Sequence, residues 1–466
     1  MADGSSQPTV AIVGAGLAGL AAACALSDSG FRVTLFERRP YLGGRASSYE
    51  HPGTGEIVDN CQHVLFGSCT NLIAFYRTIG IEDKIRWFDR MTFIEPGGRQ
   101  SILEPTFLPA PLHVTPSFLG FKFLGVRDKL AVARGLMALI GRPPKDAGNF
   151  QEWLLRHRQT PVAIERFWKP ILVSALSEDL DRISVPYAAQ VVRESMKSRV
   201  ARRMGIPTVP LTELYNSARD YITTRGGTVR FRNSVQSFMP TARGVRLKLQ
   251  DSLQNSNDEF DYAVLAVPFD SLAKLLPDSS ESAELRAKLA YFETSPITGV
   301  HFWFDRQITD LDHAVLLDRT IQWMFHKSKL LGRNLEGSYV ELVISSSKLL
   351  IEKSRQEIID LALKELHEFF PAACEAKLLK STVIKEVNAT FSPTPGIDRY
   401  RPSQPTPWPR IFLAGDGTAT GWPATMEGAV RSGYLAAKAV TKTSGSAKNF
   451  LVPDLPATGL MRILEE

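Results

Sequence analysis

The chain has 466 residues, 44% of them hydrophobic, and a net charge of +6, which suits a globular protein of two domains. The positive charge is not gathered into a basic cluster between aromatic residues, so we expect no nucleic-acid partner. The four cysteines lack metal or disulfide spacing, and the polar segment 1–8 lacks a secretory signal. We therefore expect a metal-free protein of the cytoplasm.

The first predicted element is a buried strand over 9–13 that turns into an alanine-rich helix ending near residue 30. Glycines in this turn permit a tight bend, close approach of a pyrophosphate and packing of the helix on the strand. Free N–H groups at the helix start favour bound phosphate. A second strand over 32–36 ends at an acid that can accept hydrogen bonds from ribose hydroxyls. The residues assigned to a dinucleotide are Gly14, Gly16, Ala18, Gly19, Glu37 and Arg38.

Two groups of polar residues follow the second strand. Gly43, Gly44 and Arg45 come first, and the guanidinium of Arg45 can clamp a pyrophosphate through two hydrogen bonds. Asp59 and His63 share one side whether their segment is a helical turn or is extended. This pair could supply a proton to a reaction. The structural alternative is that Asp59 orders a loop while His63 bonds to the backbone.

The segment 105–140 combines many apolar residues with four prolines in its first half and a basic helical pattern in its second. Arg127, Lys129 and Arg134 lie among the apolar residues of that second half. One interpretation is a core segment of the substrate domain. The other is a patch, or the mouth of a lipid tunnel, that contacts the inner face of the cell membrane.

The rest of the chain predicts two interleaved domains. An alternating pattern over 229–235, a hairpin over 243–250 and a strand over 261–268 return to the nucleotide domain. Strands over 299–304 and 339–344 and a helix over 355–369 belong to the other domain. The predicted nucleotide domain comprises 1–85, 207–275 and 396–445, the substrate domain 86–206 and 276–395, and a tail 446–466.

The last predicted motif is a buried strand that ends in Gly-Asp and leads into a second helix aimed at a ligand. An adenine dinucleotide needs one glycine-rich turn, whereas FAD also carries a ribityl chain and an isoalloxazine ring that a two-part pattern fits. The residues assigned to this part are Gly415, Asp416, Ala424, Thr425 and Met426. We therefore predict an α/β fold, in which a Rossmann-like FAD-binding domain of the glutathione-reductase type interleaves with an α+β substrate domain.

With both motifs, the chain resembles the superfamily of flavin amine oxidases and phytoene desaturases. The resemblance implies that Asp416 binds the ribityl and phosphate region and that the backbone at Val235 contacts adenine. It also places the segment 59–72 under the flavin, which implies cofactor contacts for Gln62 and His63. Many flavin amine oxidases carry a glycine where this chain has Cys61, so the resemblance leaves the local backbone open there.

Segments 167–176, 322–325, 385–396 and 415–433 resemble the squalene-associated FAD-dependent desaturases more specifically. That resemblance implies reductive dehydroxylation of hydroxysqualene to squalene, a precursor of hopanoids and other triterpenoids. Protonation of an allylic hydroxyl releases water, and the cation that remains takes a hydride from reduced FAD in a dry cavity. The partners implied are a hydrophobic isoprenoid and a reductant, either NAD(P)H or a reductase. The predicted acid is a hydrogen-bonded Asp59–His63 pair, with Glu427 in reserve.

Such a cavity needs apolar walls, although each aromatic residue could equally belong to an ordinary core. The candidate lining residues are Phe167, Trp168, Trp303, Trp323, Phe325 and Trp422. Three alternative functions stay open. A carotenoid desaturase or isomerase, of the phytoene or ζ-carotene type, would remove hydride from the lipid. A flavin amine oxidase would share the fold, and a prenyl-binding escort protein would do no redox chemistry.

Overall fold

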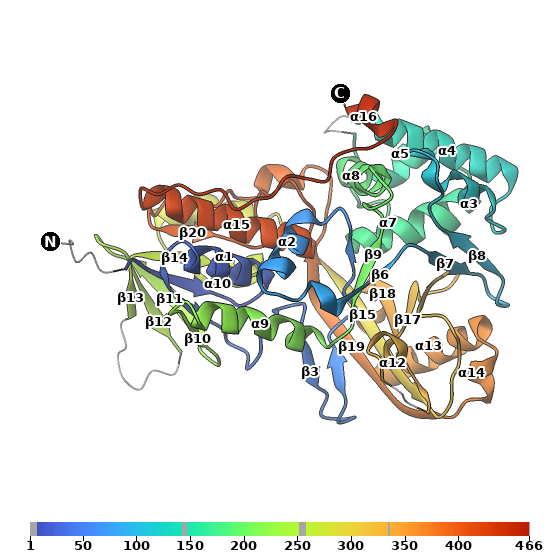
Figure 1. Ribbon diagram of the computed structural model, residues 1–466, viewed down its shortest axis with the longest axis horizontal. Coiled ribbons are helices and arrows are strands. Elements are labelled where there is room, and N and C mark those ends of the chain that lie inside the picture. The colour runs from blue at the N-terminus through green and yellow to red at the C-terminus, as the bar shows by residue number, and fades with distance from the viewer. Residues whose placement is uncertain (1–6, 142–146, 251–257, 334–335, 466) are drawn as a thin grey trace.

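The computed structural model describes residues 7–141, 147–250, 258–333 and 336–465, so most of the polar segment 1–8 lies outside it (Figure 1). A five-stranded parallel sheet lies toward one end of the molecule. Its strands, in spatial order, are β10 (Thr228–Arg230), β2 (Arg32–Phe36), β1 (Thr9–Val13), β14 (Tyr262–Leu265) and β20 (Ile411–Leu413).

Both faces of this sheet are covered, which explains the unbroken apolar run of β1. Val10 and Ile12 pack on the side of helix α1 (Leu17–Ser27), whereas Ala11 and Val13 face the opposite cluster. Helix α15 (Met426–Thr443) lies along α1 (Figure 1). The helices can approach closely because residue 433 is a glycine. A Cβ atom there would lie only 2.2 Å from the Ala18 carbonyl oxygen.

A seven-stranded sheet forms the other end of the molecule (Figure 1). All of its neighbouring strands are antiparallel except β16 and β7. The strands, in spatial order, are β19 (Leu378–Phe391), β15 (Thr294–Phe304), β18 (Ser338–Ser345), β17 (Trp323–His326), β16 (His313–Leu316), β7 (Met91–Ile94) and β8 (Gln100–Leu103). Helix α13 (Arg355–Phe369) packs on this sheet through Ile358 and Leu366, and it begins with a Ser354–Glu357 capping box.

A helical layer follows in the upper right of Figure 1, built around an aromatic core that includes Phe118, Phe150 and Trp168. Its helices are α3 (Thr115–Leu119), α4 (Val126–Ile140), α5 (Phe150–Arg156), α6 (Pro161–Ala163), α7 (Lys169–Leu176), α8 (Val185–Met196) and α16 (Met461–Glu465). Helix α16 belongs to this layer because Met461 is buried against Ala110 and Ile140. The C-terminal end of the predicted tail therefore packs on the segment 105–140, whereas Phe450 and Leu451 pack on the core around α1.

Three small sheets and six further α-helices complete the part of the fold that the structure describes. The small sheets are β11 (Val235–Pro240) with β12 (Val245–Leu249) and β13 (Asp258–Phe260), β3 (Ser48–Glu50) with β4 (Ile57–Asp59), and β9 (Met204–Pro207) between β5 (Leu65–Phe66) and β6 (Ile85–Phe88). The helices are α2 (Thr70–Thr78), α9 (Leu211–Thr223), α10 (Phe269–Leu275), α11 (Ala283–Leu289), α12 (Lys327–Leu330) and α14 (Ala372–Glu375).

The α/β fold is confirmed, and the predicted helix over 355–369 is found with the same bounds. The alternating run 229–235 is not one strand, because β10 ends at Arg230 and the chain turns at Arg232, where φ is +56°. Its two ends therefore belong to different sheets, in β10 and β11. The parallel sheet takes its strands from three separate stretches of chain, an arrangement that supports the two interleaved domains, which we retain as a proposal.

Candidate active site

The glycine turn after β1 forms a cradle at the start of α1. Gly14 has φ of +100°, and a Cβ atom there would lie 2.5 Å from the Ala266 carbonyl oxygen, so only glycine fits. Gly16 bridges to Gly43, and a Cβ on Gly16 would point toward the Cα of Gly44 at 3.9 Å. No side chain caps α1, and its first turn carries no acid. Its backbone N–H groups therefore suit a pyrophosphate.

Glu37 holds this cradle in shape. Its two carboxylate oxygens accept hydrogen bonds from the backbone N–H groups of Ala15 and Arg39, both at 2.8 Å. A carboxylate has further acceptor positions, which leaves capacity for ribose hydroxyls. Arg39 also donates to the Gly44 carbonyl oxygen at 3.0 Å, a contact that the sequence did not predict. The neighbouring Arg38 is exposed, and Val235 is half-buried at the start of β11.

Arg45 and Asp416, which are far apart in sequence, form an ion pair with 2.5 Å between Nη2 and Oδ1. Arg45 also donates to the Ala389 carbonyl oxygen at 2.9 Å, which ties the cradle to the last residues of β19. Buried Arg401 donates to the Asp416 carbonyl oxygen at 2.9 Å and so helps to hold the Gly-Asp turn in place. The two predicted cofactor motifs are therefore brought together, and Arg401 is a site residue that the sequence did not reveal.

Lys327, which the sequence also did not reveal, is the centre of a group of buried polar side chains. Its ammonium lies 2.6 Å from Asp59 Oδ2, 2.7 Å from Gln62 Oε1 and 3.5 Å from Glu341 Oε2. We call Asp59, Gln62, Lys327 and Glu341 the Lys327 cluster. All four side chains are buried. No sequence motif marks it, because α12 and β18 meet the segment 59–62 only in the folded chain.

Asp59 is therefore not the proton donor that we predicted. Burial alone would raise its pKa, but the Lys327 ammonium and hydrogen bonds from Ser48 and the Leu211 N–H outweigh burial and lower the pKa below 3.8. Asp59 is a carboxylate at neutral pH. The predicted Asp59–His63 hydrogen bond is wrong as well, because Asp59 accepts from Ser48, Leu211 and Lys327, while His63 Nδ1 is directed to the Cys61 carbonyl oxygen.

His63 points its Nδ1 to the Cys61 carbonyl oxygen at 2.7 Å. Burial disfavours the imidazolium and lowers the pKa of His63 below 6.5, although the Cys61 carbonyl partly opposes this effect. His63 is therefore neutral at pH 7. Cys61 does not adopt a positive φ, so a side chain is accommodated where many flavin amine oxidases have glycine. Contacts of Gln62 and His63 with the flavin remain predictions.

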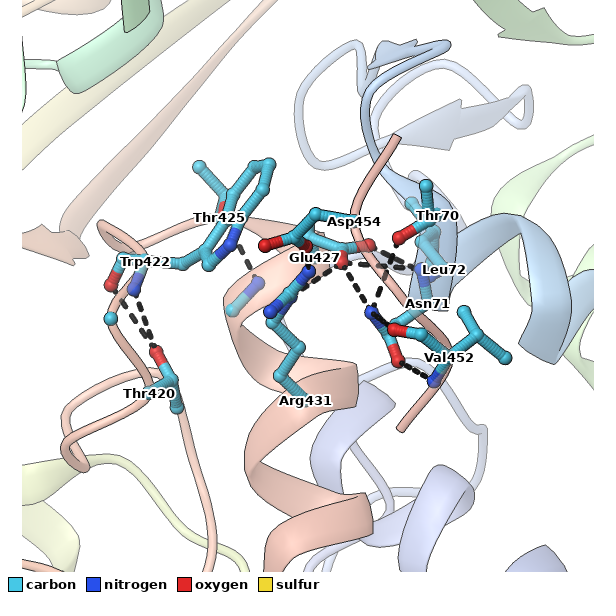
Figure 2. Close-up of polar contacts among 12 residues, drawn as sticks. Thr70, Asn71, Leu72, Thr420, Trp422, Thr425, Glu427, Arg431, Val452 and Asp454 are labelled. Atoms are coloured by element: carbon cyan, nitrogen blue, oxygen red, sulfur yellow. Dashed lines mark hydrogen bonds and ion pairs between the residues drawn. The ribbon is translucent and has the colours of Figure 1, made fainter. Parts of the chain in front are cut away.

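The carboxylate of Glu427, our reserve acid, is held by hydrogen bonds from two helices (Figure 2). It is fully buried and accepts hydrogen bonds from the backbone N–H groups of Asn71 and Leu72 at 3.2 and 2.8 Å. Arg431, one helical turn later, donates to it at 2.6 Å. Thr425 caps α15 by accepting from the Gly428 N–H at 3.1 Å. Glu427 thus joins the starts of α2 and α15 and has no free oxygen for proton transfer, so we withdraw it as the acid.

The six predicted lining residues separate into different regions. Phe167 and Trp168 lie in the aromatic core of the helical layer, where Trp168 donates to Gln159, so we assign them to the core. Trp303 stacks on Tyr339, and Trp422 lies over the Arg431 guanidinium. Trp323 and Phe325 stack at 5.5 Å between ring centres, and Phe325 packs on Cys61. Phe325 is paired with Glu341 of the Lys327 cluster across β17 and β18.

This geometry agrees with comparisons to known proteins. The family model of flavin-containing amine oxidoreductases matches residues 17–441. The chain belongs to this family. Solved structures of similar fold include an oxidoreductase from Methanosarcina mazei, with a TM-score of 0.71 and 16% identity over 91% of this chain and 98% of that one. Putrescine oxidase has a TM-score of 0.68 and 18% identity over 94% of this chain and 99% of that one. Both confirm the fold.

Carotenoid desaturases are similar to this flavoprotein in sequence. The 15-cis-phytoene desaturase of Synechococcus elongatus is 28% identical over 92% of this chain and 95% of its own. The probable zeta-carotene desaturase of the same organism is 28% identical over 94% and 99%. The cofactor is FAD, as the two motifs predicted, and the protein is an FAD-dependent oxidoreductase. The glycine cradle, Glu37 and the Arg45–Asp416 pair fit that cofactor.

We predict that Glu37→Ala and Arg45→Ala each weaken FAD binding about ten- to a hundredfold, because each removes charge-assisted hydrogen bonds worth roughly 1.5–3 kcal/mol. Fluorescence titration of the apoprotein with FAD measures the change. Arg77→Ala is the matched control, because this exposed arginine on α2 pairs with Glu82, outside the cradle. Wild-type affinity in both variants would contradict the placement of the cofactor.

Proposed function

We propose that this flavoprotein removes hydrogen from a long isoprenoid hydrocarbon, as a carotenoid desaturase of the phytoene or ζ-carotene type. The observation that carries the proposal is the similarity to such desaturases over more than nine-tenths of this chain. The stacked Trp323–Phe325 pair and Cys61 give the Lys327 cluster an apolar border that suits a hydrocarbon. FAD supplies the hydride acceptor, and a residue of the chain must accept the proton.

The test is an anaerobic incubation of the FAD-loaded protein with 15-cis-phytoene or ζ-carotene in detergent micelles. We expect bleaching of the oxidised flavin and a longer-wavelength carotenoid spectrum, because each new double bond extends the conjugated system. A quinone acceptor is added in a parallel sample to permit repeated turnover. Unchanged spectra with both lipids would contradict the proposal. Putrescine serves as the amine comparison, and flavin reduction by it would indicate an amine oxidase.

Reductive dehydroxylation of hydroxysqualene is the second candidate. It is favoured by the buried Lys327 cluster, since a hydrocarbon offers no hydrogen bond to the carboxyl of Glu341 whereas a substrate hydroxyl does. This reaction consumes a proton and a hydride, releases water, and requires reduced FAD and an external reductant. Squalene formation from hydroxysqualene by the photoreduced protein is the corresponding assay.

We further propose that the helical layer contacts a membrane surface. Six large apolar side chains from 105–140 are exposed, including Phe107, which is 89% exposed. On α4, Val126, Leu130 and Met137 form an outward stripe opposite the buried Val132, Gly135 and Leu139. Arg127 and Lys129 flank this stripe, as suits anionic headgroups. No helix among the described residues is long and apolar enough to span a bilayer.

We predict that Leu130→Ser with Met137→Ser lowers liposome binding about tenfold or more, because each exposed side chain loses part of the roughly 1.5–3 kcal/mol available from burial. Flotation with vesicles that contain anionic lipid measures the change. Leu349→Ser with Leu379→Ser is the control, because these exposed residues lie outside the helical layer. Arg134 is avoided because its guanidinium donates to the His157 carbonyl oxygen. Equal flotation of the wild type, the Leu130 and Met137 variant and the control would show that this stripe does not bind the membrane.

A further inference from the structure

Gly299 in β15 faces a small gap lined by polar atoms from three segments. A Cβ atom at Gly299 would lie 3.5 Å from His301 Nε2, 3.8 Å from the Asn60 carbonyl oxygen and 3.9 Å from Glu341 Oε1. These are ordinary contact distances, so a methyl group added at Gly299 fits without a clash. His301 and Glu341 are paired across the antiparallel strands β15 and β18, which places both side chains on one face of the sheet.

Polar atoms at this gap lack hydrogen-bond partners within the described part of the chain. They are His301 Nε2 and both carboxylate oxygens of Glu341, and all are buried. The other ring nitrogen of His301 lies 2.9 Å from Tyr339 Oη, and Lys327 Nζ is 3.5 Å from Glu341 Oε2. Buried polar atoms are nearly always satisfied by protein or by ordered water. The gap is therefore suited to an oxygen atom that both donates and accepts.

We propose that Glu341 exchanges a proton with the substrate through an oxygen atom held over Gly299. The inference rests on the proposed function, which requires a proton acceptor or donor in the chain. In desaturation the oxygen is a water, and it passes to the Glu341 carboxylate the proton that leaves as the C=C bond forms and the hydride goes to FAD. In dehydroxylation the oxygen is the substrate hydroxyl, which takes the proton of the Glu341 carboxylic acid, so that the C–O bond breaks and water leaves.

The charges around Glu341 suit this role. Its pKa is raised to about 7, because burial disfavours the carboxylate more strongly than Lys327 favours it, and the carboxylate of Asp59 adds repulsion. Burial lowers the pKa of His301 to about 3, so that the imidazole stays neutral. Burial also raises the pKa of the Cys61 thiol and of the Tyr339 hydroxyl, which both remain protonated. Glu341 is thus the facing group that changes its charge near neutral pH.

The first test observes this proton without catalysis. Glu341→Gln is compared with Glu365→Gln, which alters a buried carboxylate that accepts from the Thr320 and Ile321 N–H groups on the far side of the sheet. We expect an infrared carbonyl band of a protonated carboxyl that disappears as the pH rises through about 7 in the wild type and in Glu365→Gln. Glu341→Gln should lack that titration. Identical titrations in all three proteins would overturn the inference.

Stability gives a second readout of the same group. The folded-state pKa of Glu341 exceeds its ordinary value of 4.5, so the folded protein holds the proton more tightly than the unfolded chain. The contribution of Glu341 to stability is complete below pH 4.5 and is lost as the pH rises through about 7. We expect the thermal midpoint of the wild type, relative to that of Glu341→Gln, to fall over this interval. A constant difference would count against the proposal.

Catalysis decides the direction of transfer. We expect Glu341→Gln to lower kcat about 10²–10⁴-fold, the usual range for a general acid or base. A wild-type kcat that rises with pH through about 7 indicates a base, and one that falls indicates an acid. Wild-type kcat with an unchanged pH profile in Glu341→Gln would overturn the inference. If the wild type converts neither lipid, the proposed function fails, and the infrared titration still decides whether Glu341 holds the proton.

Gly299→Ala identifies the oxygen, because the added methyl group fills the gap without a clash. Displacing a water should lower kcat on the hydrocarbon with little change in KM, whereas excluding a substrate hydroxyl should raise KM for hydroxysqualene. Gly141→Ala is the control, since its Cβ meets neighbours at similar distances of 3.6 and 3.9 Å at the end of α4. Wild-type kinetics in Gly299→Ala on the substrate that turns over would show that no bridging oxygen is used.

Discussion

Lys327→Met will lower the free energy of unfolding by about 3–5 kcal/mol, the usual cost of removing one partner from a buried ion pair. Lys327 is only 3% exposed, and its ammonium is 2.6 Å from the Asp59 carboxylate. Methionine fills a similar volume but leaves Asp59 and Glu341 in the interior without their cation. Chemical denaturation followed by circular dichroism measures the loss.

Two comparisons separate the lost charge from lost packing. Lys169→Met removes an exposed ion pair with Glu165 and should change stability far less. Adding Asp59→Asn and Glu341→Gln to Lys327→Met removes the uncompensated carboxylates and should recover part of the loss. The deficit of Lys327→Met should also shrink in acid, because the lowered pKa of Asp59 gives the wild type a contribution that is lost as the pH falls through that pKa. If the triple variant has lost as much free energy of unfolding as Lys327→Met at every pH, lost packing alone explains the loss.

Glu427→Ala is expected to cost about 3 kcal/mol of stability while the surviving folded protein keeps its turnover. The side chain joins two helix starts, since it accepts from the Asn71 and Leu72 N–H groups of α2 and from Arg431 of α15 (Figure 2). Its removal leaves two buried N–H groups unpaired and weakens the hold on the Arg431 guanidinium. Arg431 retains Asp454 as a partner, which limits the loss.

Thermal unfolding and single-turnover flavin kinetics together test this assignment. Glu284→Ala is the control, because Glu284 forms an exposed ion pair with Lys288 one helical turn later. Its thermal midpoint should stay close to that of the wild type. A Glu427→Ala protein with a wild-type midpoint and a large loss of turnover would show that Glu427 takes part in chemistry after all.

The sequence by itself determined the FAD half of the protein. Strand, glycine turn, helix and terminal acid are contiguous within residues 9–37, so local rules of backbone geometry and hydrogen bonding fix how they fold. Gly14 needs a positive φ wherever that turn occurs, and Glu37 follows β2 by one residue. The Gly-Asp turn at 415–416 could be recognised for the same reason. Residue type and spacing therefore sufficed for the cofactor.

Only the tertiary structure decided which groups surround each candidate for proton transfer. Asp59 and His63 are close in sequence, yet Lys327 of α12 takes the Asp59 carboxylate and the Cys61 carbonyl takes the His63 ring. Glu341 gains its partners through the register of β15 with β18, which pairs it with His301 across 40 positions of chain. Burial and charge set a pKa, and both depend on which distant segments pack around a side chain. A single sequence specifies these residue types but not their neighbours, so Glu341 could be proposed as the proton-exchanging group only from the folded chain.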